Sequence, residues 1–476
     1  MKRLLAMLGG ALLAAACSAP ARLPLYQPRL GAHFANAPAQ ATQAQEARAQ
    51  EARAQEKVMQ EPVAQFWRGF HDLELDRLVE AALAANADLR IAAARLSEAR
   101  ALARYANAQS LPDIGLAATA ARGRARDTTG AILTGNSFDT ELDMRWETDL
   151  FGAIRGARRA AAADARASAA QLRAVQVSVA AEVARNYFEL RGLQEQLRVA
   201  VAALESQRQT STLVNARLSA GRGSGFDADR ADALVQTTAA SVPALDSALV
   251  RTRYRLAVLS GQPPTALDAR LAAPKPVPGI APTALDRIGS PQSLLRRRPD
   301  VAAAEQQVAA AAARIGVAQS ELFPQLTLGG SLGLNAGSVG ALDQRDALIF
   351  NLGATLMWSL VDFGRRRAQV AAASARGAAA VATYEKTVLE ALEETEGALA
   401  AYTRAQRRTE SLYGAARSAG SAAELARARF TAGSSDFLAV LDAEREALVA
   451  RDSLAQATTA GATSLVAVYK ALAGGW

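Results

Sequence analysis

The sequence predicts a mainly α-helical chain that is built from two copies of one unit and carries transmembrane β-strands. Three observations support this fold class. Landmark residues recur at a constant separation of 212 residues, two runs of about 70 residues contain no proline, and one 13-residue stretch alternates strictly between two kinds of side chain. Constant spacing indicates internal duplication, long proline-free runs favour helices, and period-two alternation is typical of a strand with two different faces.

The duplication rests on five pairs of residues at the same separation. The pairs are Pro112 with Pro324, Trp146 with Trp358, Phe151 with Phe363, Gly152 with Gly364, and Gly221 with Gly433. In each copy the proline precedes a first strand-like stretch, the tryptophan lies in a second one, and the Phe-Gly pair precedes a long helical run. We expect repeat 1 at 66–262, repeat 2 at 300–476, and a proline-rich crossover at 263–299.

The first residues predict export. Lys2 and Arg3 precede an apolar run too short to span a bilayer, so residues 1–16 are interpreted as a signal peptide. Cys17, the only cysteine, follows directly and resembles the lipid acceptor of a bacterial lipoprotein. The alternative is an incidental cysteine beside an ordinary cleavage site. Residues 17–65 contain a low-complexity repeat at 44–56 without an apolar stripe, and we interpret them as a lipidated tether.

Each copy then contains two strands. Asp72 is a candidate N-cap for the first helix of the body, and a second helix ends before Pro112. Strands are expected at 113–122 and 138–150 in repeat 1, and at 325–334 and 349–361 in repeat 2.

The strand at 138–150 shows the clearest pattern in the chain. Its even-numbered residues are apolar or threonine, and its odd-numbered residues are all charged. In a transmembrane barrel the apolar face contacts lipid and the charged face lines a wet lumen; in a soluble sandwich the charged face would meet bulk water. Tilted by about 40°, the strand spans about 33 Å along the barrel axis, which is enough for a bilayer. The expected lumen residues are Asp139, Glu141, Asp143, Arg145, Glu147 and Asp149.

Aromatic residues mark the strand-to-helix junction of both copies. Trp146, Phe151, Trp358 and Phe363 stand at equivalent strand ends. An interfacial aromatic girdle is expected at such positions in a membrane barrel. The alternative is that these side chains belong to an ordinary core.

Two long helices with shorter return helices follow the strands. The long runs cover 152–220 and 365–432, and the return helices cover 227–260 and 435–472. A continuous helix of this length reaches about 100 Å. Apolar residues of the first run recur with a mean spacing near 3.5, the period of a coiled coil. Each long run ends at an Ala-Gly, which is a C-cap signal.

The residues also exclude several functions. His33 and His71, the two histidines, lack Cys or carboxylate neighbours at metal-ligand spacing, and no phosphate-binding loop follows a strand, so neither an enzyme nor a metal site is predicted. The net charge of +8 is spread along helices without a nucleic-acid motif, so no nucleic-acid partner is expected. Four strands are too few to enclose a lumen. Other copies of the chain must complete the barrel, which predicts a cyclic oligomer.

Several stretches of this sequence resemble a known family. They are Trp67-Arg-Gly-Phe70, Trp146-Glu-Thr-Asp-Leu-Phe-Gly152, Arg297-Arg-Pro-Asp300, Phe323-Pro324, Asp362-Phe-Gly364, Leu441-Asp442-Ala-Glu-Arg445 and Tyr469-Lys-Ala-Leu-Ala-Gly-Gly-Trp476. With them the chain resembles the outer-membrane factors of tripartite efflux, the TolC-like channels, and specifically the OprM/NodT lipoprotein branch. Ala87, where the family often has proline, and Ala473, where it often has glycine, depart from the pattern.

The resemblance implies a homotrimer in the outer membrane of a Gram-negative bacterium. Four strands from each chain would form a 12-stranded barrel, continued by a helical tunnel in the periplasm. The implied partners are a periplasmic adaptor protein and an inner-membrane transporter, commonly of the RND type. The implied modification is an N-acyl diacylglycerol lipid on Cys17, with no other cofactor.

The implied function is a passive, gated export duct for drugs or other small molecules. The resemblance places the periplasmic gate at Leu438, an apolar ring, and Asp442, a carboxylate ring, with Arg445 as a pairing partner. Two alternatives stay open. One is the outer-membrane duct of a type I secretion system, and the other is a structural coiled-coil lipoprotein without a pore.

Overall fold

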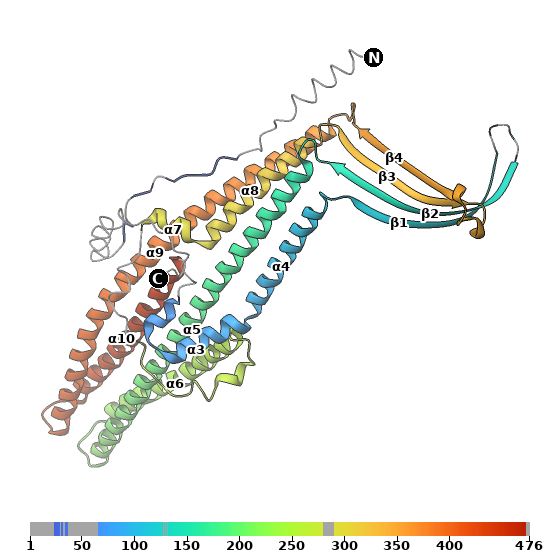
Figure 1. The fold of residues 1–476 in the computed structure, drawn as a ribbon. Helices are drawn as coiled ribbons and strands as arrows, with labels where there is room; N and C mark the ends of the chain where they lie inside the picture. Colours follow the sequence, from blue (N-terminus) through green and yellow to red (C-terminus); the bar gives the residue numbers. More distant parts are fainter. Residues whose placement is uncertain are drawn as a thin grey trace. The chain divides into compact units, whose positions relative to one another are not determined.

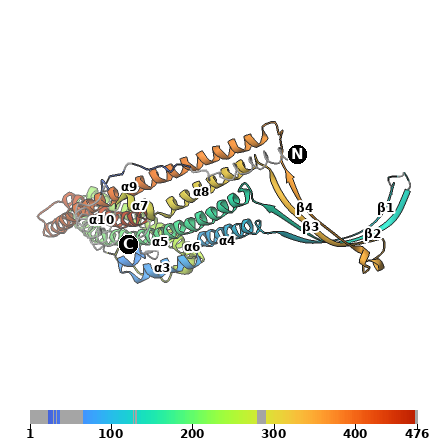
Figure 2. The same ribbon diagram turned by 45° about the horizontal axis from the view of Figure 1, so that its top comes forward.

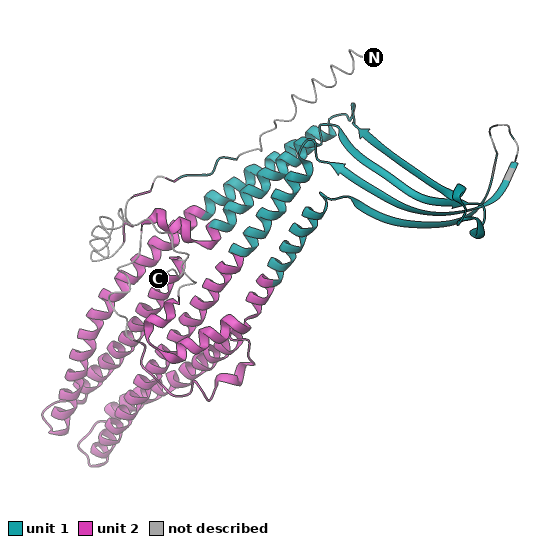
Figure 3. Cartoon of the chain, viewed as in Figure 1, with its two compact units in different colours: residues 1–27, 94–170, 302–387 teal, residues 28–93, 171–301, 388–476 magenta. Residues whose placement is uncertain are grey.

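The computed structural model describes residues 23–28, 30–31, 34–36, 65–126, 128, 130, 132–278 and 290–472. The predicted signal peptide, Cys17, the repeat at 44–56, His33, residues 279–289 of the crossover and residues 473–476 lie outside the described residues. The chain divides into two compact units (Figure 3). Unit 1 comprises Met1–Gln27, Ala94–Ala170 and Ala302–Thr387, and unit 2 comprises Pro28–Ala93, Gln171–Val301 and Val388–Trp476.

The elements follow the same order in both copies (Figure 1). The first copy contains α4 (Ala87–Ala108), β1 (Asp113–Arg126), β2 (Ile132–Thr148), α5 (Ala153–Ser219) and α6 (Gly225–Leu259). The second contains α8 (Pro299–Ser320), β3 (Gln325–Ala336), β4 (Leu348–Met357), α9 (Arg365–Thr431) and α10 (Phe437–Ala471). Both long helices have 67 residues and both return helices have 35. The predicted internal repeat is therefore confirmed.

Shorter elements complete the described chain. They are η2 (Phe66–Phe70), α3 (Leu73–Ala85), η3 (Pro264–Leu267), α7 (Pro291–Arg297), η5 (Val339–Ala341) and η6 (Arg345–Ala347). No helix among the described residues combines the length and the apolar character that crossing a membrane requires.

The four strands of unit 1 form one antiparallel sheet in the order β1-β2-β3-β4 (Figure 2). Each strand differs in extent from its predicted range. β1 and β2 continue as a hairpin beyond the expected residues, to Arg126 and from Ile132, because their ladder stays in register over the whole length. β2 ends at Thr148, β3 continues to Ala336, and β4 ends at Met357, so Asp149 and Trp358 lie just beyond strand ends.

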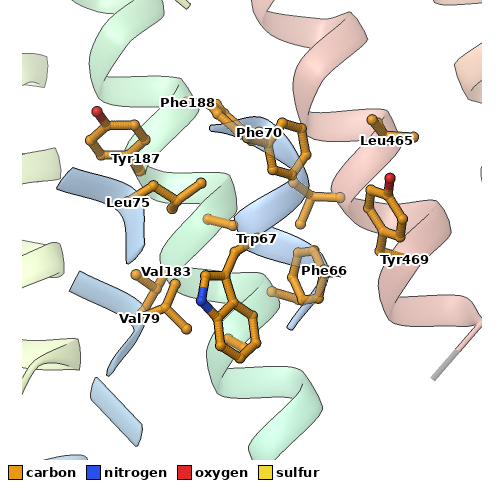
Figure 4. Close-up of a cluster of buried hydrophobic side chains, with 14 of the residues drawn as sticks. Phe66, Trp67, Phe70, Leu75, Val79, Val183, Tyr187, Phe188, Leu465 and Tyr469 are labelled. Atoms are coloured by element: carbon orange, nitrogen blue, oxygen red, sulfur yellow. The ribbon is translucent and has the colours of Figure 1, made fainter. Parts of the chain in front are cut away.

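An aromatic core holds unit 2 together (Figure 4). The Phe66 ring stacks on the Tyr469 ring with centroids 5.2 Å apart, and Phe70 meets Phe188 edge-on at 4.8 Å. Burial of each such side chain contributes about 1.5–3 kcal/mol to stability. The periodic apolar residues of α5 face this core, and Val179, Val183, Tyr187 and Leu190 are all buried.

Part of the segment interpreted as a tether belongs to unit 2 and packs within it. Phe34 is buried in the aromatic core. The Glu396 carboxylate on α9 accepts hydrogen bonds from Ala35 N at 2.7 Å and Asn36 N at 3.0 Å. Residues 34–36, which belong to the segment that we interpret as a tether, therefore dock on α9. This contact needs only the buried Phe34 ring and the backbone N–H groups of the turn that follows it. The sequence does not predict it, because so short a segment contains no periodic apolar stripe.

The helix ends follow their sequence signals. The Asp72 side chain accepts hydrogen bonds from Glu74 N and Leu75 N, which confirms it as the N-cap of α3. Gly221 and Gly433 adopt positive φ angles of 70° and 75° after the long helices. The N–H groups of Arg222 and Ser434 donate back to Arg217 O and Arg429 O, the pattern of a Schellman C-cap.

Candidate functional site

One face of the sheet in unit 1 is apolar across all four strands, except at the end of β1 around Arg122–Arg126. The register pairs Leu142 with both Leu116 and Leu332, and Leu332 with Phe350. Even-numbered residues of neighbouring strands therefore share a face. The large apolar side chains exposed on this face are Ile114, Leu116, Ile132, Leu142, Trp146, Leu332, Leu348, Phe350, Leu352 and Leu356. A continuous apolar face of this kind suits contact with lipid.

The opposite face carries charge almost entirely on β2. Asp139, Glu141, Asp143, Arg145 and Glu147 lie on it, and Asp113 at the start of β1 is the one other charged strand residue there. Neighbouring positions hold small residues: Gly333 is opposite Glu141, and Gly329 is opposite Arg145. A Cβ on Gly333 would lie 2.5 Å from Thr140 O, so only glycine fits at that position. The charged side chains of β2 therefore have small neighbours on this face of the sheet, which leave space around them.

Asp149 departs from its predicted place on the charged face. It follows the end of β2, and its carboxylate accepts hydrogen bonds from Ile154 N at 3.0 Å and Arg155 N at 2.8 Å. These are free N–H groups in the first turn of α5. Asp362 does the same for α9, and the N–H groups of Arg366 and Gly364 lower the pKa of its carboxyl. Asp149 is therefore a helix cap rather than a residue of the strand face.

The two tryptophans make equivalent contacts in the two copies. Trp146 Nε1 donates to Ser110 O and Trp358 Nε1 donates to Leu322 O, both at 3.1 Å and both across 36 residues. The two phenylalanines differ. Phe151 stacks on Phe323 with ring centroids 4.9 Å apart, whereas Phe363 is 97% exposed with a φ of 52°. Three of the four proposed girdle residues are thus exposed at the junction, and Phe151 packs within unit 1.

In unit 2, a small cluster joins the ends of the two long helices. Phe430 and Phe437 pack there with Val214 and Val440. The Arg217 guanidinium at the end of α5 lies 4.0 Å from the centre of the Phe430 ring, and its Nη2 donates to Phe430 O at 2.5 Å. The cluster and this arginine together connect the turn between α5 and α6 to the turn between α9 and α10.

The predicted gate residues occupy the exposed face of α10. Leu438 is 44% exposed, and Asp442 and Arg445 are exposed as well. The buried face of the same helix carries Phe437, Val440, Leu441 and Glu444. Within the described part of the single chain, Asp442 and Arg445 make neither an ion pair nor a hydrogen bond. The structure thus places the three residues on one free helix face but does not pair the two charges.

The sequence interpretation missed Glu444, which lies two residues after Asp442. Glu444 is buried, accepts a hydrogen bond from Thr210 Oγ1 at 3.0 Å, and lies 2.9 Å from Arg427 Nε. It therefore links α10 to both long helices. The sequence could have predicted this role, because Glu444 falls at helical spacing on the apolar stripe of α10 and a carboxylate buried there requires partners.

These features define a class of protein. A duplicated strand–strand–long helix–return helix unit, a two-faced sheet and joined helix ends are the architecture of an outer-membrane efflux channel. The chain belongs to the outer membrane efflux protein family, whose model matches residues 78–262 and 290–474. The two matches are offset by the same 212 residues as the landmark pairs, so each covers one copy.

Individual relatives agree with this assignment. The chain is 32% identical to the pyoverdine export outer membrane protein OpmQ of Pseudomonas aeruginosa, over 87% of this chain and 88% of OpmQ. It is 32% identical to the solvent efflux pump outer membrane protein SrpC of Pseudomonas putida, over 86% of each chain. The solved structure of the outer-membrane channel OprN superimposes with a TM-score of 0.85 at 38% identity, covering 95% of this chain and 99% of that chain.

The family, the fold class, the location and the general function expected from the sequence are therefore confirmed. The chain is an outer-membrane component of an efflux system. Its structural neighbour OprN is itself an outer-membrane channel.

Proposed function

We propose that three copies of this chain close their sheets into one barrel and form a passive, gated duct for small molecules. The main support for this proposal is that neither edge strand of the sheet has a second partner strand among the described residues. Among the described residues, β1 pairs only with β2 and β4 pairs only with β3. Backbone groups without partners are not tolerated in lipid. Because strand directions alternate, β4 of one copy and β1 of the next meet as antiparallel partners, and the ring closes without a free edge.

The two faces of the sheet then acquire separate roles. The apolar face of Leu116, Leu142, Leu332 and Phe350 meets lipid, and the charged side chains of β2 point into the lumen. Exposed Trp146, Trp358 and Phe363 form the girdle at the end of the sheet from which the helices continue. We assign Cys17, which lies outside the described residues, as the site of an N-acyl diacylglycerol anchor.

The helix ends in unit 2 supply the gate. Leu438 and Asp442 are one helical turn apart on the exposed face of α10, and three symmetry-related copies of that face around an axis make an apolar ring and a carboxylate ring. Arg445 of the same face then serves as a partner for Asp442 across the copies. The duct catalyses no reaction. A periplasmic adaptor and an inner-membrane transporter, which we take to be of the RND type, deliver the substrate and the energy.

A small-molecule duct is favoured over a type I secretion duct by the relatives, whose names refer to pyoverdine export and solvent efflux. A coiled-coil lipoprotein without a pore has no use for a two-faced sheet with unpaired edges.

Deletion of the gene tests the proposed function. The deletion strain is expected to accumulate a fluorescent efflux dye and to become sensitive to hydrophobic drugs or solvents, with an unchanged set of secreted proteins. Complementation by the wild-type gene should restore both properties. Loss of a secreted protein with unchanged dye accumulation would instead support the secretion duct.

A further inference from the structure

The outer end of β1 carries three arginines on one face of the sheet. Arg122, Arg124 and Arg126 are exposed, and they pair with the uncharged residues Asn136, Thr134 and Ile132 of β2. They are even-numbered, like Ile114 and Leu116 at the other end of the strand. The arginines therefore continue the face that is apolar elsewhere and that we assign to lipid.

Their height along the strand places them at the edge of the apolar band. Arg122 lies nine residues after Asp113, which is about 30 Å along a strand and about 23 Å along the barrel axis at a tilt near 40°. The apolar band of a membrane barrel is about 25 Å tall. Arg122 thus reaches the boundary of the band, and Arg124 and Arg126 lie beyond it at the level of lipid headgroups.

The strand pairing gives the same boundary independently. β3 ends at Ala336, which pairs with Phe138, and Phe138 pairs with Ala120 of β1. All three arginines therefore lie on the part of the β1–β2 hairpin that extends past β3 (Figure 2). The helices α5 and α9 follow the opposite end of the sheet, so the hairpin end is the one at the outer leaflet. In an outer membrane, that leaflet consists of phosphorylated glycolipid.

The internal repeat shows that the strand itself does not require these arginines. The residues 212 positions after Arg122 and Arg124 are Leu334 and Ala336 on β3. The first copy therefore carries charge where the second copy remains apolar. Arg126 Nη1 donates to Gly130 O at 2.9 Å, which orients its guanidinium and leaves its other N–H donors available.

We propose that Arg122, Arg124 and Arg126 bind the phosphate groups of lipid A, the phosphorylated glycolipid of the outer leaflet. A guanidinium matches the oxygens of a phosphate with paired N–H donors. Residues at i, i+2 and i+4 of a strand stand in a row about 7 Å apart, so neighbouring arginines can engage both phosphates of one headgroup or those of adjacent lipids. The proposal rests on the lipid-facing assignment made for the proposed duct.

The test compares lipid A binding by three forms of the full-length protein. These are the wild type, the triple variant Arg122→Gln, Arg124→Gln, Arg126→Gln, and a control triple variant Arg159→Gln, Arg367→Gln, Arg376→Gln. The control removes the same charge from exposed arginines on the helices of unit 1. Each form is delipidated in detergent and titrated with bisphosphorylated lipid A, phosphatidylglycerol or inorganic phosphate, and bound lipid is counted by native mass spectrometry.

The wild type and the control are expected to bind lipid A equally and more tightly than phosphatidylglycerol, with no displacement by millimolar phosphate. Since an interfacial arginine contributes about fivefold to the binding of anionic lipid, the hairpin variant should bind lipid A roughly 100-fold more weakly. A matching triple Arg→Lys variant keeps the charge but loses the paired donors, so its affinity for lipid A should lie between those of the wild type and the Gln variant. Equal affinity of the hairpin variant and the wild type, or an equal loss in the control, would overturn the proposal.

Channel conductance separates this proposal from the proposed function. The hairpin variant should conduct like the wild type, because its substitutions lie on the lipid face. A wild-type protein that binds lipid A but does not conduct would contradict the duct and leave the lipid site standing.

Discussion

Asn86 and Arg298 occupy equivalent positions in the two copies and perform the same task. Asn86 Nδ2 donates to Leu259 O at 2.9 Å, and Arg298 Nη1 donates to Ala471 O at 2.8 Å, both across 173 residues. Each acceptor is the last residue of a return helix, where carbonyl groups lack intrahelical partners. The two copies therefore keep the same contact with different side chains. Arg298 also pairs with Asp300 at 2.7 Å and with Glu394 at 2.8 Å.

Arg298→Ala should destabilise unit 2 strongly. Arg298 is buried, and its removal leaves Ala471 O and Asp300 without their main partner and leaves Glu394 with Lys470 alone. Breaking a fully buried pair costs about 3–5 kcal/mol, and the partial exposure of the Asp300 and Glu394 carboxylates lowers the cost here. We expect a clear fall in the apparent unfolding temperature of the purified protein. Arg297→Ala, at the exposed neighbouring position, is the matched control and should change little. Equal effects of the two substitutions would contradict a specific role for Arg298.

The same cluster should make the protein sensitive to acid. Burial alone would raise the pKa of Glu394, but hydrogen bonds from Lys470 and Arg298 outweigh burial and lower it, and Arg298 likewise lowers the pKa of Asp300. A carboxyl whose pKa is depressed by folding stabilises the protein above its ordinary pKa, and this contribution disappears as the pH falls toward the folded pKa. The unfolding temperature should therefore drop below about pH 4.5. Glu394→Gln should be less stable at pH 7 and show a shallower acid dependence. An unchanged pH profile in Glu394→Gln would exclude this carboxyl as a contributor.

Cys17→Ser should abolish lipidation but leave the trimer in the membrane. The apolar face of the closed barrel holds the protein there without a lipid anchor. Metabolic labelling with a radioactive fatty acid measures the first effect, and membrane fractionation measures the second. A labelled Cys17→Ser protein would show that another group is the acceptor.

The lumen should prefer cations. The face of the sheet that we propose to line the lumen carries Asp139, Glu141, Asp143 and Glu147 together with the single cation Arg145 of β2. We expect cation selectivity at low salt, weaker at high salt because of screening. Glu141→Gln should reduce the selectivity, whereas Glu80→Gln, an exposed carboxylate on α3, should not. Anion selectivity of the wild type in a planar bilayer would show that the faces of the sheet are assigned the wrong way round.

Much of the architecture could be predicted because its signals are local and repeated. Proline, the Ala-Gly pairs and period-two alternation set the ends of α5 and α9 to within one residue and identified both faces of β2. Contacts between distant residues could not be predicted. Asn86 and Arg298 have unlike side chains, so the 212-residue spacing hides their common role. Asp149 fits the alternation of β2, but the free N–H groups of α5 compete for its carboxylate. Leu438 and Asp442 were assigned by resemblance, and the single chain shows only that they share an exposed face.

We propose above that this chain forms a duct, and we expect its narrowest point at the exposed face of α10. Single-channel recording of the purified protein in planar bilayers tests it most directly, with the wild type compared with the double variant Asp442→Ala, Arg445→Ala. A second double variant, Asp229→Ala, Arg222→Ala, removes the same charges from exposed positions near the turn between α5 and α6. We predict small conductance for the wild type and this control, and a several-fold larger conductance for the α10 variant. Absence of conductance in all three proteins would contradict the duct, and equal conductance in all three would place the constriction elsewhere.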